Sequence, residues 1–204
     1  MTSRLPLRRL AAALALCLLA ACTTITKVGP GQAAVKDLSF TLDAGWNRFE
    51  SAALVLFQAP GATEIWTREG FSLDVLAFYA GIGDGEEIGR ALPRSTKKMP
   101  VFRAKMAPQE ILEAFEVVIT QDGSTFTLGK LEPARFGGWN GFHYEYTLKR
   151  KGDSLLFNGV GWGAVANGKL YLMSYSAPRT YYFNKLLPGI EAVAKTASIG
   201  GPRR

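Results

Sequence analysis

Apolar and polar residues alternate along much of the chain, and this pattern predicts a protein built mainly from β-strands. In the clearest case, residues 142–148, even positions are apolar or aromatic and odd positions are polar. Asn167-Gly168 predicts a tight hairpin, because both residues accept a positive φ. A second hairpin turn is predicted at Glu69-Gly70. The predicted strands cover residues 35–42, 46–49, 53–57, 65–68, 71–79, 126–131, 142–148, 155–166 and 170–175.

Two segments have the 3.6-residue period of amphipathic helices. The first covers residues 108–120, where Pro108 suits the first helical turn and Glu110 complements the helix dipole. The second runs over residues 183–194, and Pro188 predicts a break or a restart within it. Residues 81–85, with three glycines, predict a loop, and residues 86–106 follow no clear pattern.

This order of elements predicts the fold class. One helix lies between two groups of strands, the other follows the last strand, and no internal repeat is visible. Neighbouring strands joined by short turns pair antiparallel, and helices bury their apolar stripes against a sheet. We therefore expect an α+β domain, an antiparallel β-sheet flanked by helices.

The first 21 residues have the pattern of a secretion signal. Three arginines lie within residues 1–9, and an unbroken apolar run fills residues 10–21. The run is shorter than the roughly 20 residues that cross a bilayer as a helix. The sequence Leu19-Ala20-Ala21-Cys22 resembles the bacterial lipobox, which implies that Cys22 becomes the acylated N-terminus. The alternative is an ordinary signal peptide that ends near an unmodified cysteine.

These features divide the chain into three expected segments. Residues 1–21 form a lipoprotein signal peptide, residues 22–34 a lipidated N-terminus and flexible tether, and residues 35–200 a single α+β domain. The alternative for the tether is a first edge strand, which we favour less because Gly29-Pro30-Gly31 interrupts it. Thr23 follows the cysteine, which resembles an outer-membrane address in lipoproteins of the enterobacterial type. The expected location is the cell envelope, at the periplasmic face of the outer membrane.

Composition and charge exclude several classes of protein. The chain is 48% hydrophobic and 20% charged, which excludes a disordered protein. The signal holds three arginines and no acid, so the mature part has 21 basic and 17 acidic side chains, a net charge of +4. That charge suits a protein beside anionic lipid and does not indicate nucleic-acid binding. With Cys17 removed and Cys22 acylated, the domain has no thiol.

Several stretches between residues 108 and 199 resemble a known superfamily. They are Phe136-Gly137-Gly138, residues 141–146 (GFHYEY), residues 168–175 (GKLYLMSY) and the closing helix up to Ser198-Ile199. Together they resemble the PsbP-like α/β/α sandwich superfamily, named for an extrinsic protein of the photosynthetic oxygen-evolving complex. The resemblance implies the fold and no fixed catalytic set, and similar domains serve as assembly factors and binding modules.

The candidate chemistry of the domain is sparse. His143 is the only histidine, and Glu145 lies two residues further on the same face of a strand. One interpretation is a base oriented by a carboxylate. We favour a structural polar pair between strands, because the sequence offers neither a positioned nucleophile nor a second nitrogen ligand for a metal. We predict no metal site, no cofactor and no enzymatic activity.

Three glycines alternate with larger residues in Gly159-Val160-Gly161-Trp162-Gly163. A nucleotide-binding loop has glycines where a strand ends and a helix begins. These glycines instead lie inside a strand pattern. They predict a flat strand face on which a helix or an aromatic ring lies.

Two basic features are candidate contact surfaces. Six cations and no anion occupy residues 90–105, and they predict either a surface for lipid, phosphate or an acidic partner, or a solvated loop. The six cations are Arg90, Arg94, Lys97, Lys98, Arg103 and Lys105. Arg179 lies in an aromatic C-terminal region, which is either core or a partner contact.

We therefore expect a membrane-anchored envelope lipoprotein whose domain is a non-catalytic protein-binding or assembly module, held to the membrane through Cys22. The alternative is a periplasmic domain that binds a small ligand or lipid, and an enzyme using His143 with Glu145 is a third hypothesis. A partner-binding module requires an exposed aromatic patch, a carrier requires a large apolar cavity, and an enzyme requires both side chains in one pocket.

Overall fold

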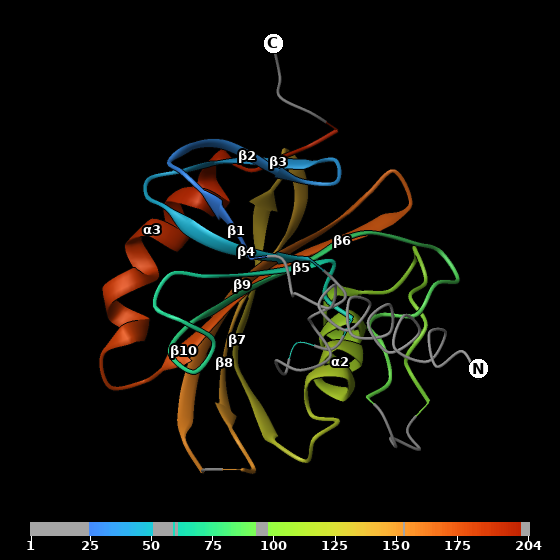
Figure 1. Cartoon of the computed structure of the whole chain (residues 1–204). Helices are drawn as coiled ribbons and strands as arrows, with labels where there is room; N and C mark the ends of the chain where they lie inside the picture. The colour runs from blue at the N-terminus through green and yellow to red at the C-terminus, as the bar shows by residue number, and fades with distance from the viewer. Residues whose placement is uncertain (1–24, 51–58, 60, 93–97, 153, 201–204) are drawn as a thin grey trace, which may run out of the picture.

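The computed structural model describes residues 25–50, 59, 61–92, 98–152 and 154–200, which form two antiparallel sheets and two helices (Figure 1). The large sheet has eight strands in the order β1 (Ile25–Val28), β4 (Trp46–Glu50), β5 (Glu64–Thr67), β6 (Val75–Gly83), β10 (Lys169–Pro178), β9 (Leu156–Ala166), β8 (Trp139–Lys149) and β7 (Thr125–Phe136). The small sheet consists of β2 (Gly31–Val35), β3 (Leu38–Leu42) and β11 (Ser198–Ile199).

The two helices cover opposite faces of the large sheet (Figure 1). On one face α2 (Pro108–Ile119) buries its apolar stripe, and the ring of Phe115 packs edge-on against Tyr79 and Tyr144. On the other face α3 (Tyr182–Thr196) packs beside the small sheet, and Ile190 belongs to the same core as Phe78. The predicted α+β sandwich, an antiparallel sheet flanked by helices, is therefore confirmed.

The predicted tether is wrong between residues 25 and 34. β1 pairs with β4 along its whole length, from Ile25 opposite Phe49 to Val28 opposite Trp46, and β2 pairs with β3. Gly29-Pro30 connects these two strands, and the positive φ of 119° at Gly31 re-aims the chain into β2. The proline and glycines thus separate two short strands, and the folded domain includes the chain from residue 25 onward, with β1 in the large sheet and β2 in the small one.

The predicted loop at residues 81–85 is also wrong in part. β6 continues to Gly83, and the register with β10 shifts between Leu170 and Tyr171. Gly81 is the extra residue at this shift and has a φ of 70°, which is the conformation that a glycine bulge requires. The strand predicted at residues 53–57 lies outside the described residues.

The glycines of β9 lie under the aromatic rings of β8. Gly159, Gly161 and Gly163 stand directly opposite Tyr146, Tyr144 and Phe142. A Cβ at Gly161 would lie 2.3 Å from Cζ of Tyr144, and a Cβ at Gly159 or Gly163 would meet the opposite ring just as closely. The expectation that aromatic rings lie on a flat strand face is confirmed. The rings in turn form the surface on which α2 packs.

α3 continues through Pro188, so the predicted break is wrong. A proline removes one helical N–H, and here the carbonyl that loses its partner belongs to Asn184. Both residues are exposed, so water can bond to that carbonyl. The buried residues of α3 lie before and after Pro188 on one face, and their packing holds the helix together.

Replacing Pro188 by alanine is expected to raise the free energy of unfolding by about 1 kcal/mol. Alanine restores the N–H that bonds to the carbonyl of Asn184, and it favours a helix more than proline does. The unfolded chain gains conformational entropy when proline is removed, which offsets part of this stabilisation. Urea denaturation of the purified domain measures it. Pro133→Ala, at an exposed position in the edge strand β7, is the control and is expected to change stability by less than about 0.5 kcal/mol. A destabilised Pro188→Ala variant would contradict this account of α3.

Candidate functional site

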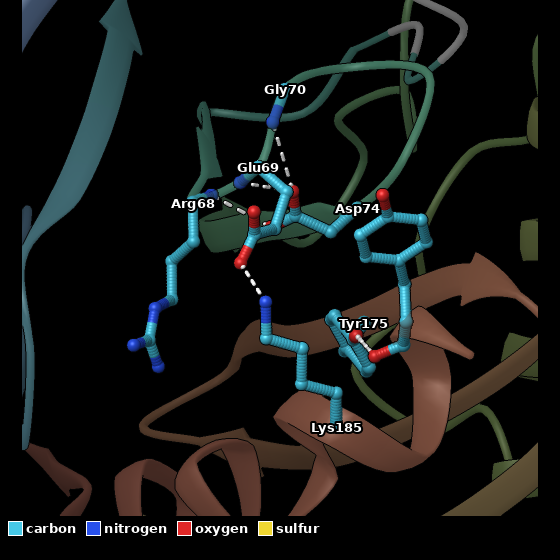
Figure 2. A network of polar contacts seen from close by, with 7 residues as sticks. Arg68, Glu69, Gly70, Asp74, Tyr175 and Lys185 are labelled. Carbon is cyan, nitrogen blue, oxygen red and sulfur yellow. Dashed lines mark hydrogen bonds and ion pairs between the residues drawn. The ribbon is translucent and has the colours of Figure 1, made fainter.

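A buried carboxylate organises the connection between β5 and β6. Asp74 is fully buried, and its oxygens accept the backbone N–H groups of Arg68 at 2.7 Å, Glu69 at 2.7 Å and Gly70 at 3.1 Å (Figure 2). Burial raises the pKa of Asp74, and the three backbone hydrogen bonds oppose that rise. The carboxylate accepts three backbone N–H groups and so fixes the turn, which is a structural role.

This turn holds the beginning of α3. The Nζ of Lys185 lies 2.6 Å from the Glu69 carboxylate, as Figure 2 shows. On the sheet beneath, the hydroxyl of Tyr175 donates to the carbonyl of Tyr182 at 3.1 Å. Burial raises the pKa of Tyr175, so its hydroxyl keeps the proton that it donates. The first turn of α3, and the residues just before it, therefore have a defined position.

The segment just before α3 contributes to a patch at one end of the sheet, which we call the end patch and define as Arg150, Leu155, Leu156, Arg179 and Tyr181. Four of these residues are exposed, and the half-buried Arg150 has its guanidinium 4.6 Å from the centre of the Phe157 ring. Backbone hydrogen bonds join its parts, from Arg179 N to Leu156 O and from Arg150 N to Leu155 O, both at 3.0 Å. Tyr181 is 59% exposed, Leu155 45% and Leu156 38%. The end patch therefore combines apolar side chains with cations.

The aromatic region around Arg179, which the sequence predicts to be either core or a partner contact, contains both buried and exposed residues. Arg179 is exposed, and of the aromatic residues near it Tyr181 alone is largely exposed, because Tyr175 and Phe183 are buried. Leu155 and Leu156 were not predicted as contact residues. The signal for them was present: two adjacent leucines break the alternation at the start of a strand, so one of them cannot face the core.

His143 and Glu145 do not form the predicted candidate pair. The Nδ1 of His143 lies 2.9 Å from a carboxylate oxygen of Glu132, its neighbour on β7, and its ring contacts Trp162 with centroids 5.2 Å apart. Lys130 lies 2.9 Å from Glu132 and 4.0 Å from Glu145. The favoured interpretation, a polar pair between strands, thus has Glu132 as the partner. Lys130 first, and then His143, holds the pKa of Glu132 below its usual value.

The basic segment is flanked by acids. Residues 84–88 run beside residues 100–104, with backbone hydrogen bonds between Gly85 and Phe102 and between Ile88 and Pro100. Exposed carboxylates at 84, 86 and 87 therefore lie beside the basic run. Four of the six cations are exposed, namely Arg90, Lys98, Arg103 and Lys105, and the other two, Arg94 and Lys97, lie outside the described residues. In the described part of the chain this surface carries both signs of charge.

A groove of about 460 Å³ opens where the small sheet meets the end of α3 and the β7–β8 turn. Its polar lining residues are Gln32, Ser39, Thr41, Arg135, Lys195, Thr196 and Ser198. The guanidinium of Arg135 already donates to the carbonyl of Gly138 at 2.5 Å and to Asn140 at 3.2 Å. The groove has the size of a small-molecule site, but its lining is not the mostly apolar one that an apolar ligand requires.

Two negative findings concern only the residues that the structure describes. Among them no three histidine, cysteine, aspartate or glutamate side chains lie close enough together to hold a metal ion. Within the same ranges, neither helix combines the length and the apolar character needed to cross a membrane.

Comparisons with known proteins give no match in sequence and several in structure. No protein-family model matches the chain, and no curated protein is significantly similar to it. The solution structure of cyanobacterial PsbP (CyanoP) from Synechocystis sp. PCC 6803 matches with a TM-score of 0.55 and 12% identity, over 88% of this chain and 95% of that one. A crystal structure from Bacteroides thetaiotaomicron matches with a TM-score of 0.44 and 11% identity, over 86% of this chain and 49% of that one.

The CyanoP match tests the resemblance that the sequence motifs indicated. The motifs lie between residues 108 and 199, whereas the structural match covers 88% of the chain and so includes much of the first half. At 12% identity the match concerns architecture alone. The described architecture, a large antiparallel sheet between α2 and α3, agrees with it. The chain has a PsbP-like α+β sandwich fold.

Proposed function

We propose that this protein is a lipid-anchored module of the bacterial cell envelope that binds an acidic protein through the end patch and is not an enzyme. The anchor is the acylated Cys22, and the location is the periplasmic face of the outer membrane. The basis for the anchor is the arginine-rich, apolar leader that ends in a lipobox-like sequence. An enzyme has less support, because the half-buried His143 is bonded to Glu132 and does not line the groove beside the small sheet.

The observation that carries the proposal is the composition of the end patch. Tyrosine and arginine are frequent anchors in protein interfaces, and here Tyr181 and Arg179 lie two residues apart beside two exposed leucines. Lys149 and Lys151 are exposed next to Arg150, so cations border the apolar side chains. Apolar contacts provide binding energy, and the cations favour a partner with carboxylates at the matching positions.

Site-specific cross-linking in intact cells tests this function. A photoreactive amino acid at position 181 is expected to capture one predominant protein. The same amino acid at Val117, an exposed apolar position on α2, is the control and is expected to capture none. Arg179→Glu is expected to reduce the captured amount about tenfold, because it reverses the charge that meets the partner. Lys105→Glu, at an exposed cation outside the patch, is expected to leave it unchanged.

Two results would contradict the proposal. Equal capture at positions 181 and 117 would show that the end patch has no specific partner. Capture that is insensitive to Arg179→Glu would show that the charge of the patch plays no part. The anchor is tested separately by the mass of the purified protein: the wild type is expected to begin at Cys22 and to carry the mass of its acyl chains, and Cys22→Ala is expected to lack that added mass.

A further inference from the structure

The first strand of the domain begins very close to the proposed lipid anchor. β1 begins at Ile25, where it pairs with Phe49 of β4, so the chain has a fixed position three residues after Cys22. Three residues span at most about 10 Å, even when fully extended. The headgroup region of one leaflet is itself roughly 5–8 Å thick. An acylated Cys22 therefore holds the start of β1 within a few ångströms of the membrane surface.

The residues at this place suit a lipid surface. β1 is an edge strand, paired with β4 on one side and with no other described strand on its outer side. Ile25 is 55% exposed, Thr26 and Lys27 are exposed, and β1 contains no carboxylate. An apolar side chain at the level of the headgroups and a lysine that reaches the lipid phosphates are both favourable there.

We propose that the β1 edge of the large sheet lies on the lipid bilayer, with anionic headgroups around Lys27, so that the sheet stands on the membrane by this edge. The inference rests on the lipid anchor in the proposed function. Adjacent strands lie about 4.8 Å apart, so β7, the eighth strand, lies roughly 34 Å from β1 across the sheet. The end patch belongs to β9, to the turn that precedes it and to the segment between β10 and α3, so this orientation leaves it open to a protein partner.

Quenching of a fluorophore by lipid tests the orientation. The mature domain has no cysteine other than the acylated Cys22, so an introduced cysteine is the one reactive thiol. Thr26→Cys on β1 and Thr127→Cys on β7 are a matched pair, because both threonines are exposed on edge strands. Each full-length lipidated variant is labelled and reconstituted in phosphatidylethanolamine–phosphatidylglycerol vesicles that carry a nitroxide on the headgroup.

We expect the label at position 26 to be quenched at least about threefold more than the label at position 127, because quenching by a headgroup nitroxide requires close contact. Inserting about twelve Gly/Ser residues between Thr24 and Ile25 is expected to abolish most of this difference, because a flexible linker frees the domain from the surface. In the variant without the linker, vesicles that lack phosphatidylglycerol are expected to give weaker quenching at position 26, because Lys27 then lacks anionic headgroups.

The mass of the intact protein separates failure of the orientation from failure of the anchor. An acylated protein with equal quenching at positions 26 and 127 overturns the orientation and leaves the anchor intact. In that event the occupant of the β1 edge in cells would be something other than lipid, for example a strand of a partner protein. An unacylated protein overturns the anchor and the orientation with it. Strong quenching at position 26 that survives insertion of the linker overturns the part given to the short connection between Cys22 and β1.

Discussion

Replacing Gly161 by alanine is expected to lower the free energy of unfolding by about 3 kcal/mol. The added methyl group would lie 2.3 Å from Cζ of Tyr144, and that ring is fully buried. The ring cannot move away easily, because it packs edge-on against Phe115 of α2 and beside Tyr146. The clash therefore either displaces α2 or opens the ladder between β8 and β9.

Chemical denaturation followed by tryptophan fluorescence measures this effect. Gly129→Ala is a matched control within the same sheet: Gly129 has no positive φ, and a Cβ there would meet its nearest neighbour, the carbonyl oxygen of Glu145, at an ordinary 3.5 Å. Its expected effect is below about 1 kcal/mol. The double variant Tyr144→Ala with Gly161→Ala is expected to lose less stability than the two single variants lose together, because alanine at position 144 removes the clash. Equal effects at Gly161 and Gly129 would contradict the role given to the ring.

Replacing Asp74 by alanine is expected to lower the free energy of unfolding by about 3 kcal/mol. The change removes the acceptor of three backbone N–H groups, those of Arg68, Glu69 and Gly70. These donors lie in a turn that also carries the Glu69–Lys185 ion pair. We therefore expect the first turn of α3 to loosen, and proteolysis between residues 179 and 185 to become faster than in the wild-type protein.

Asp74→Asn and Asp122→Ala complete this experiment. The asparagine keeps one acceptor oxygen, so the free energy of unfolding of Asp74→Asn is expected to lie between that of the wild type and that of Asp74→Ala. Asp122 is a turn aspartate of the same kind, which accepts the N–H and the hydroxyl of Ser124, but it is only half-buried. Water can replace its bonds, so Asp122→Ala is expected to lower stability by about 1 kcal/mol. An equal loss for both alanine variants would contradict the importance of burial.

The fold was predictable where local patterns agree with tertiary packing. Residues 142–148 alternate cleanly, and the structure places Tyr144 on the face toward α2 and His143 on the opposite one. Asn167 and Gly168 have the positive φ angles of 51° and 74° that their sequence predicted. Such features depend on neighbouring residues alone, so a single sequence contains the information.

Other features depend on pairings that a single sequence does not contain. The partner of His143 is Glu132, and their alignment depends on a register shift between Leu128 and Lys130 in β7. The strands at residues 25–35 are short and rich in small or polar residues, and they are stabilised by partners elsewhere in the chain. The end patch needed the structure as well, because Leu156 and Arg179 are brought together by the β9–β10 pair, far apart in the sequence.

The small sheet has a consequence for the order in which the elements of the domain form. β3 lies between β2 and β11, and the N–H of Thr41 donates to the hydroxyl of Thr196, 155 residues later. β2 and β3 therefore lie at the opposite end of the domain sequence from their last partner. The pairings within the meander β8–β9–β10 close only short loops. Pairing β11 with β3 instead joins Ser39 to Ser198, 159 residues apart, so we expect the small sheet to form late. Until β11 pairs with it, β3 therefore has β2 as a partner on one side and an unpaired edge on the other.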